Sequence, residues 1–491
     1  MPICDPLYLA LLLPIVLICY ALPAGHWRAA FLLIVSYAYY LTFPLAFFPI
    51  LVAVTLVAYV GGLLIERCRE TRFFASVVTA VLLACFAPMI FYKYLIPLWS
   101  AVSDQGDGTD WGATTAAQVL FPVGLSFYTF AAAGYLADIA LGLTAAERRP
   151  LTLALFCGFF PIVTQGPIPR TAGTLGQLHF KRGFDAERGM RGISEILIGA
   201  VMKVWIADSL AGPSEMVYAD LANCPPLEHL VATIYFAFQI YADWAGYSLI
   251  AIGSARLLGI DIPENFRQPY LSTNMQEFWR SWNISLMNWL RDYVFTPLCL
   301  LLRRWPPRLA TSVAVFITMI LLGVWHAVGW GYVLYGVANG LLVVGSQWTL
   351  ASRDRFWRSV GCPALLVTLF RIPATFLLVV FTDIIVRAQS LDDVLYIYSG
   401  VFSPALISNF ANVFSADPDP SKGVFHHIHF NMDVLLIAAL IVGDIFARTK
   451  TVPVFRFPVP ARAAVYSACA IAVLYYAASP HIARPFVYFR F

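Results

Sequence analysis

Apolar residues in this chain gather in long, nearly uncharged stretches that alternate with short polar segments. Many of the stretches have about the 20 residues that a helix needs to cross the hydrocarbon core of a bilayer. About twelve are visible, near residues 6–23, 30–49, 50–65, 74–97, 117–141, 192–210, 229–255, 309–327, 332–350, 362–386, 432–447 and 462–478. The pattern predicts an all-α polytopic integral membrane protein with about 11–13 transmembrane helices.

Basic residues mark one end of most of these stretches. They cluster at 67–72, 148–149, 181–191, 303–308, 353–358 and 448–456, whereas the intervening loops at 104–110, 220–228, 392–393 and 417–419 are acidic. Positively charged loops stay on the cytoplasmic side, so we expect the N-terminus outside. The first residues carry no positive charge, and we therefore expect the first apolar stretch to be a helix rather than a removable signal.

Two segments do not fit a simple crossing. Residues 151–167 are apolar but lie between two basic clusters, which predicts a re-entrant hairpin buried in protein or lining a wet cavity. Residues 256–308 are polar at first, then aromatic, with basic residues at both ends. We interpret this second segment as amphipathic or re-entrant helix on the cytoplasmic side.

Composition agrees with the membrane assignment and narrows the chemistry. Hydrophobic residues make up 60% of the chain and charged residues only 12%, far from the usual quarter in soluble domains. The formal net charge of +4 is too small to indicate a nucleic-acid partner. Nine scattered cysteines lack metal spacing, and we predict no metal site. Three histidines of the long outer loop could in principle bind a metal ion, but no further ligands lie near them in the sequence. They are His426, His427 and His429.

His326 is the first candidate reactive residue. It lies in the run Leu321-Leu-Gly-Val-Trp-His326-Ala-Val-Gly-Trp330, inside a segment, 309–352, without any Asp, Glu, Lys or Arg. An ionisable group at membrane depth is costly and marks a candidate functional site. The alternative is a histidine that packs between helices and hydrogen-bonds a carbonyl group.

Asn283 is the second candidate. If residues 279–293 form one helix, the large apolar side chains share a broad face from which Asn283 also projects. A buried amide needs hydrogen-bond partners, so Asn283 either bonds a carbonyl or faces a ligand. Candidate substrate-binding residues nearby are Tyr241, Asp243, Trp279, Trp282, Arg291 and Trp325. Tyr241 and Asp243 can equally fix a helix bend, and Trp325 can equally be ordinary helix packing.

Several motifs occur in order and carry a resemblance to a known family. They are Gln239-Ile-Tyr-Ala-Asp243-Trp-Ala-Gly-Tyr247, Pro263-Glu-Asn265-Phe-Arg-Gln-Pro-Tyr270, Glu277-Phe-Trp-Arg-Ser-Trp-Asn283 and Gly323-Val-Trp-His326. Together they resemble the membrane-bound O-acyltransferase family. Within it the chain is most similar to the bacterial branch of alginate O-acetyltransferases, peptidoglycan O-acetyltransferases and teichoic acid D-alanyl transferases.

The resemblance implies an O-acyltransferase of the bacterial cytoplasmic membrane. It would move an acyl group through a tunnel, from a cytoplasmic thioester to a hydroxyl at the outer face. The donor would be acetyl-CoA or an acyl carrier protein, with no tightly bound cofactor. The acceptor side would involve an exported polysaccharide or a periplasmic transfer partner. We expect N-terminal helices over 1–115, a catalytic core over 116–400, and an outer loop with C-terminal helices over 401–491.

The family's signature histidine corresponds to His326, and its second polar position corresponds to Asn283. Here the chain departs from its branch, which usually has histidine at the second position. Asparagine cannot exchange a proton, which puts a relay between two histidines in doubt. These residue types fit a mechanism in which His326 is the general base and Asn283 donates a hydrogen bond to the developing oxyanion. The alternative function is a proton-coupled transporter or flippase for a lipid-linked sugar or small anion. A third is a scaffold without catalytic activity.

Overall fold

The chain folds into a bundle of helices. The computed structural model describes residues 2–103, 121–180, 183–413, 432–448 and 458–477, and no strand occurs among them. The α-helices are α1 (Pro6–Ala21), α2 (His26–Tyr40), α3 (Phe48–Arg67), α4 (Phe74–Ile90), α5 (Ile96–Ser103), α7 (Leu125–Ala140), α8 (Pro150–Gly158), α9 (Thr171–Thr174), α10 (Ala186–Val201), α11 (Asp208–Ala219), α12 (Pro226–Leu257), α13 (Met275–Ser281), α14 (Ile284–Leu290), α15 (Thr296–Leu301), α16 (Pro307–His326), α17 (Trp330–Ser359), α18 (Ala364–Arg387), α19 (Leu391–Val401), α20 (Pro404–Val413), α21 (Met432–Ala447) and α22 (Val459–Ala477).

Five segments of the described chain are long and apolar enough to cross a membrane. They are Leu45–Arg67, Phe74–Trp99, Pro307–His326, Trp330–Ser359 and Ala364–Arg387. The other predicted apolar stretches also coincide with helices, which are shorter, interrupted or richer in buried polar residues. The structure therefore confirms an all-α, multi-pass membrane protein, while the full number of crossings stays a prediction.

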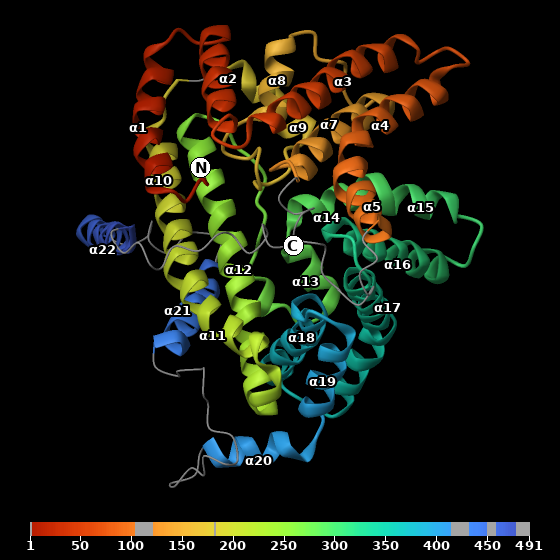
Figure 1. Cartoon of the computed structure of the whole chain (residues 1–491), viewed down its shortest axis with the longest axis vertical. Helices are drawn as coiled ribbons and strands as arrows, with labels where there is room; N and C mark the ends of the chain where they lie inside the picture. The colour runs from red at the N-terminus through yellow and green to blue at the C-terminus, as the bar shows by residue number, and fades with distance from the viewer. Residues whose placement is uncertain (1, 104–120, 181–182, 414–431, 449–457, 478–491) are drawn as a thin grey trace.

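The long helix α12 forms the centre of the bundle. Figure 1 shows α10 and α11 beside it, with α3, α4, α7 and α8 towards one end and α18 and α19 towards the other. A Cβ atom built on Gly199 of α10 would lie 2.5 Å from the carbonyl oxygen of Gly246 in α12. Only glycine permits this approach, which brings the two helices into backbone contact.

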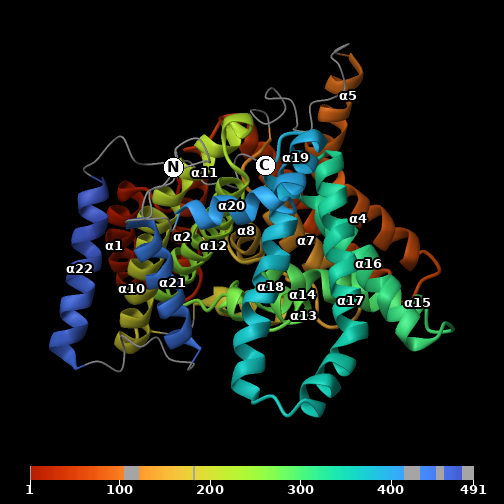
Figure 2. The ribbon, with the colours of Figure 1, turned by 90° about the horizontal axis from the view of Figure 1, so that it is seen from below.

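The ends of the spanning helices agree with the predicted orientation. In the view from below, the turn between α17 and α18 lies at one face, whereas α19, α20 and the end of α5 lie at the opposite face (Figure 2). The basic cluster 353–358 is at the first face. The positive-inside rule therefore places that face in the cytoplasm.

The predicted re-entrant segment forms a short helix followed by irregular, buried chain. Helix α8 has nine residues, which is about 13 Å and too short to cross the bilayer. Most of residues 159–169 are buried although they form no regular helix. Their backbone polar groups are shielded from lipid by surrounding protein, as irregular chain at membrane depth requires.

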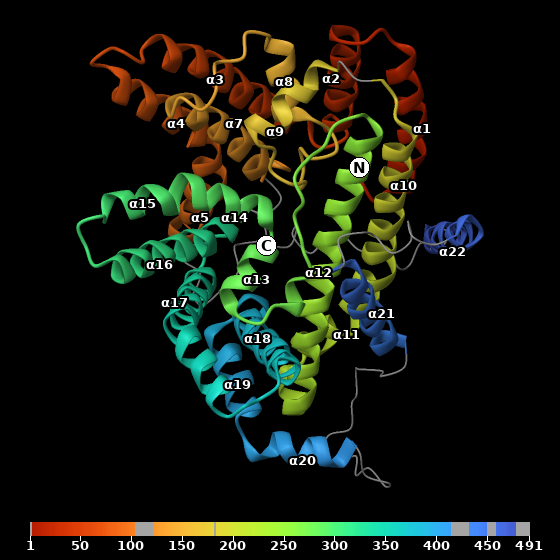
Figure 3. The same ribbon diagram turned by 180° about the vertical axis from the view of Figure 1, so that it is seen from behind.

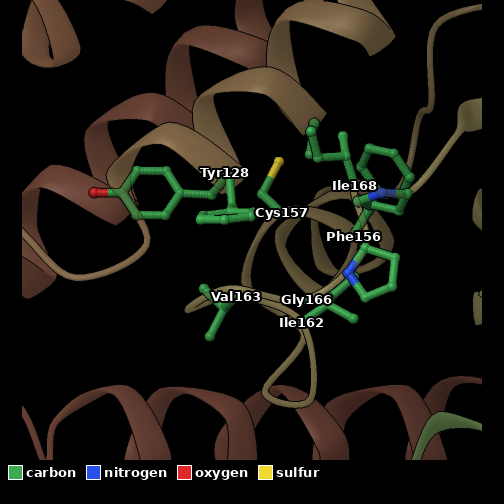
Figure 4. A pocket seen from close by; sticks show the side chains of 11 residues that line it. Tyr128, Phe156, Cys157, Ile162, Val163, Gly166 and Ile168 are labelled. Atoms are coloured by element: carbon green, nitrogen blue, oxygen red, sulfur yellow. The ribbon is translucent and has the colours of Figure 1, made fainter. Parts of the chain in front are cut away.

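A pocket opens beside this re-entrant segment (Figure 4). It is a small, partly open pocket between α7, α8 and the irregular chain. Most of the side chains around it are apolar, and the lining residues are Phe127, Tyr128, Ala131, Phe156, Cys157, Ile162, Val163, Gly166, Pro167, Ile168 and Pro169.

The expected single helix over residues 279–293 is wrong. Helix α13 ends at Ser281, Trp282 is extended (φ −104°, ψ 127°), and Asn283 adopts the left-handed conformation (φ 45°, ψ 53°) before α14 starts. The amide of Ile284 donates to the carbonyl oxygen of Asn265 at 2.8 Å instead of to an earlier turn of helix. This long-range bond replaces a helical one and stabilises the break.

Helices α16 and α17 cross in close contact at two glycines. A Cβ on Gly323 would lie 2.2 Å from the carbonyl oxygen of Tyr332, and one on Gly336 would lie 2.6 Å from that of Met319. The crossing fixes the end of α16 against the start of α17. Figure 3 shows the pair from behind, next to α13 and α14.

Candidate active site

His326 is the last residue of α16, and aromatic rings surround its imidazole. The centroid distances from the imidazole are 6.4 Å to Trp244, 4.8 Å to Trp325, 6.4 Å to Tyr332 and 6.0 Å to Tyr335. We call these five residues the histidine cage. Among the residues that the structure describes, no hydrogen bond reaches the ring of His326. Within the described residues, His326 is therefore not a packing histidine that hydrogen-bonds a carbonyl group.

Asn283 lies at the break between α13 and α14 and is 6% exposed. Its backbone carbonyl accepts the amide of Met287 at 2.9 Å, which starts α14. Its side-chain amide makes no hydrogen bond within the described chain. Asparagine tolerates the left-handed conformation better than most residues, which accounts for its place at the break. The amide itself remains available for a ligand.

Aromatic contacts connect this break to His326. The ring centroids of Trp282 and Trp244 are 6.4 Å apart, and Trp244 in turn stacks on His326. On the other side, Trp279 lies 6.5 Å from Tyr335, which also contacts His326. The helix break and the histidine cage therefore share one aromatic region, although they come from segments separated by some 40 residues of sequence.

Asn265 holds the helix break in place, a role that the sequence did not reveal. Its Oδ1 accepts the backbone amide of Ser285 at 3.2 Å and the hydroxyl of Ser285 at 2.8 Å. Its Nδ2 donates to Ser248 Oγ at 3.1 Å. The amide of Ile168, from the re-entrant segment, donates to Ser285 Oγ at 3.0 Å. Helix α12, the break and the re-entrant segment are thus joined by one buried polar network.

Tyr241 and Asp243 both have partners within the protein. The Tyr241 hydroxyl lies 2.9 Å from each carboxylate oxygen of Asp444 in α21. Asp243 Oδ1 lies 2.8 Å from Lys203 Nζ, which donates to Asp208 at 2.6 Å. In this buried ion cluster Lys203 thus gives Asp243 an ion-pair partner within the protein. The ring centroids of Tyr241 and Trp282 are 6.2 Å apart.

The remaining candidates fall into two groups. Trp279, Trp282 and Trp325 are buried, at 4%, 8% and 5% exposure, and take part in the aromatic region. The indole N–H of Trp279 has no acceptor within the described chain. Arg291 is different, because its side chain is 59% exposed and pairs with Asp292 at 2.8 Å. The outer-loop histidines 426, 427 and 429 lie outside the described residues.

Lys93 lies beside the histidine cage and was missed by the sequence analysis. Its Nζ is 5.1 Å from the ring centroid of Trp325. The signal that could have found it is the one that singled out His326, because Lys93 is the only charged residue between Phe73 and Ser103. Aromatic neighbours on both sides made the stretch look like an ordinary membrane span.

Comparison with known proteins adds an independent observation. The model of MBOAT, the membrane-bound O-acyltransferase family, matches residues 221–371, which include both Asn283 and His326. The chain is 30% identical to the probable alginate O-acetylase AlgI of Pseudomonas aeruginosa, over 81% of this chain and 74% of the relative. It is 31% identical to the teichoic acid D-alanyltransferase of Bacillus subtilis, over 45% of this chain and 58% of the relative. It is 26% identical to the peptidoglycan O-acetyltransferase of Helicobacter pylori, over 58% of this chain and 57% of the relative.

Proposed function

Because the chain belongs to the membrane-bound O-acyltransferase family and is an acyltransferase, we propose that it O-acetylates an exported cell-surface polysaccharide. The acceptor would be an alginate-like exopolysaccharide or a cell-wall polymer. The match to the alginate O-acetylases, over most of both chains, is the observation that carries the proposal. The transporter alternative is not favoured, since these relatives are named as transferases.

In the proposed reaction His326 is the general base. An acceptor hydroxyl attacks the carbonyl carbon of the thioester, and the imidazole takes the hydroxyl proton as the new C–O bond forms. The tetrahedral intermediate then breaks its C–S bond, and the imidazolium returns the proton to the departing thiolate. Such proton transfer contributes roughly 10²–10⁴-fold to a rate. The absence of a hydrogen bond to His326 within the described chain supports this role.

Asn283 is the proposed donor to the oxyanion. The carbonyl oxygen of the thioester gains negative charge in the intermediate, and a preorganised amide N–H stabilises it by about 3 kcal/mol. The buried, unbonded amide of Asn283, next to the aromatic region of His326, supports the assignment. An asparagine fits this role better than a proton relay, because it donates without titrating.

The two sides of the membrane supply the two substrates in this proposal. An acyl thioester, either acetyl-CoA or an acyl carrier protein, would enter from the cytoplasmic face through a tunnel and leave no tightly bound cofactor. The polymer, or a periplasmic protein that passes on the acetyl group, would approach from the outer face. A bacterial inner membrane is the location that provides both.

The experiment that tests the function compares complemented deletion strains. Ester-linked acetate on the surface polysaccharide is measured for wild type, His326→Ala and His26→Ala, at matched amounts of membrane protein. His26 is exposed at the start of α2 and serves as the control histidine. We expect wild type and His26→Ala to restore acetate and His326→Ala to fail. Restoration by His326→Ala would overturn the mechanism, and restoration by none would overturn the choice of acyl group.

A further inference from the structure

Lys93 is a buried cation in a membrane-spanning segment. It lies in the π-helical turn Phe91–Leu95 of the span Phe74–Trp99 and is 8% exposed. Its Nζ lies 5.1 Å from the ring centroid of Trp325 and 5.6 Å from that of Phe121. Within the described chain, no carboxylate pairs with it. A buried charge without a counter-charge is costly, so this position calls for an anion.

The residues around Lys93 contact the proposed reaction site. The hydroxyl of the next residue, Tyr94, donates to the carbonyl oxygen of Val324 at 3.0 Å. This bond ties the π-helical turn to the last turn of α16. The ring of Trp325, which faces Lys93, lies 4.8 Å from the imidazole of His326. π-Helical turns inside α-helices often occur at functional sites, and here the turn borders the histidine cage.

The position of Lys93 along its helix indicates which of the two proposed substrates it can contact. The span begins at Phe74, next to the basic cluster 67–72 that marks the cytoplasmic side. Lys93 is 19 residues further on, which is about 28 Å of helix and close to the thickness of the hydrocarbon core. It therefore lies towards the outer face, from which the acceptor approaches, and away from the side of the thioester.

We propose that Lys93 binds an anionic group of the acceptor, a carboxylate or a phosphate, close to the hydroxyl that is acylated. This inference rests on the proposed function and makes Lys93 a specificity-determining residue of the same site. The ammonium pairs with the anion of the polymer, and the pairing holds the neighbouring hydroxyl within reach of His326. Neutral polymers lack this contact and bind less tightly.

The test measures binding of three probes to the full-length protein in lipid nanodiscs by calorimetry. The probes are an oligomannuronate, an oligomer of glycerol phosphate and a neutral oligomannose, so that carboxylate, phosphate and uncharged acceptors are separated. The variants are wild type, Lys93→Met, Lys93→Arg and, as a control that also removes one positive charge, Arg355→Met. Arg355 is exposed in the basic cluster at the cytoplasmic end of α17.

We expect wild type to bind at least one anionic probe more tightly than the neutral one. Lys93→Met should weaken that binding by about 10- to 100-fold, the size of one lost bond to a charged group, and leave the neutral probe unchanged. Lys93→Arg should keep most of the affinity, and Arg355→Met all of it. Which anionic probe responds identifies the anion as carboxylate or phosphate.

Two results would overturn the inference. One is a wild-type protein that binds anionic and neutral probes equally, which needs no variant and so does not depend on the folding of Lys93→Met. The other is a Lys93→Met protein that loses all probes alike. Either result with surface acetylation intact rejects the role of Lys93 alone, whereas a wild type that restores no acetate rejects the proposed function.

Discussion

Asn283 and His326 both lie at ends of helices, where single residues determine the direction of the chain. His326 is followed by extended Ala327, and Asn283 is itself left-handed between α13 and α14. At such positions a side chain affects both the backbone and the chemistry. Tests of the proposed roles must separate these two effects.

Substitutions at Asn283 separate them. Glycine adopts a positive φ without strain, so Asn283→Gly keeps the break and removes only the amide. We expect its turnover number, kcat, to fall by about 10²- to 10³-fold, with little change in KM for the thioester and in thermal stability. Asn283→Ala should lose stability as well, because alanine at this φ is strained. Full turnover by Asn283→Gly in a thiol-release assay would remove Asn283 from the reaction.

Asn265 positions the break without contacting the reacting groups in our proposal. Asn265→Leu removes the acceptor of both Ser285 bonds, so the buried backbone amide and the hydroxyl proton of Ser285 lose their acceptor, at a cost of about 1–3 kcal/mol for each. We expect a lower melting temperature in detergent and lower acetyl transfer. As a contrast, Thr368→Ala removes an exposed hydroxyl that bonds within α18 and should change neither quantity. A stable but inactive Asn265→Leu protein would show that the network serves catalysis more than folding.

For single residues, the sequence predicts a functional role where an ionisable side chain lies in an otherwise uncharged segment. His326 could be singled out because its surroundings are uncharged, and the structure places it in the aromatic cage. The same argument applied to Lys93, whose single charge is hidden among large apolar residues. Asn265 gives no such signal, because its role depends on long-range bonds to Ser285 and Ser248 that no local pattern encodes.

Among the helices, the crossing of α16 and α17 has the least room for change. Gly323→Ala would put a methyl group 2.2 Å from the carbonyl oxygen of Tyr332, so the helices must separate. We expect a loss of about 1–3 kcal/mol of stability, seen as a lower melting temperature in detergent. The matched control is Gly345→Ala in α17, where no atom lies within 4 Å and stability should be unchanged or slightly higher. Equal melting temperatures for the two variants would contradict the crossing geometry.

The ion cluster joins η4 (Met202–Ala207) and α11 to α12. Lys203→Met leaves Asp208 and Asp243 without their shared cation, and breaking a buried pair in this way costs about 3–5 kcal/mol. The triple variant Lys203→Met, Asp208→Asn, Asp243→Asn removes the charges together and should be more stable than Lys203→Met alone. Thermal unfolding of the two proteins in the same detergent checks the order. The reverse order would assign the cluster a role other than charge compensation.

Helix positions were largely predictable, but one helix was not. Uncharged stretches of nearly 20 residues mark helices α3 and α16 because length and composition decide the outcome in a bilayer. In residues 279–293 the helical spacing of apolar side chains was real, since Trp279, Leu286 and Leu290 are all buried. The break at Asn283 depends on a hydrogen bond to Asn265, 18 residues earlier, which periodicity cannot detect.

For the molecule as a whole, the opposite faces of the bundle define the topology. We expect a cysteine at Trp305, in the turn between α15 and α16, to react with a membrane-impermeant maleimide only after the cells are opened. A cysteine at Ala405, exposed at the start of α20, should react in intact cells. Both are introduced into a variant whose nine native cysteines are replaced by serine or alanine. Labelling of both positions in intact cells would contradict the orientation.

The abrupt end of α16 has a consequence for water. A helix that stops leaves its last carbonyl groups without amide partners, and the extended Ala327 supplies no capping bond. The hydroxyl of Tyr94 donates to one group of this turn, the carbonyl oxygen of Val324. Water satisfies such groups when no ligand does, so we expect ordered water next to the proposed general base when the site is empty. For the proposed reaction we therefore expect slow hydrolysis of the thioester when no acceptor is present. The free acetate released in this way would report how completely the acceptor displaces this water.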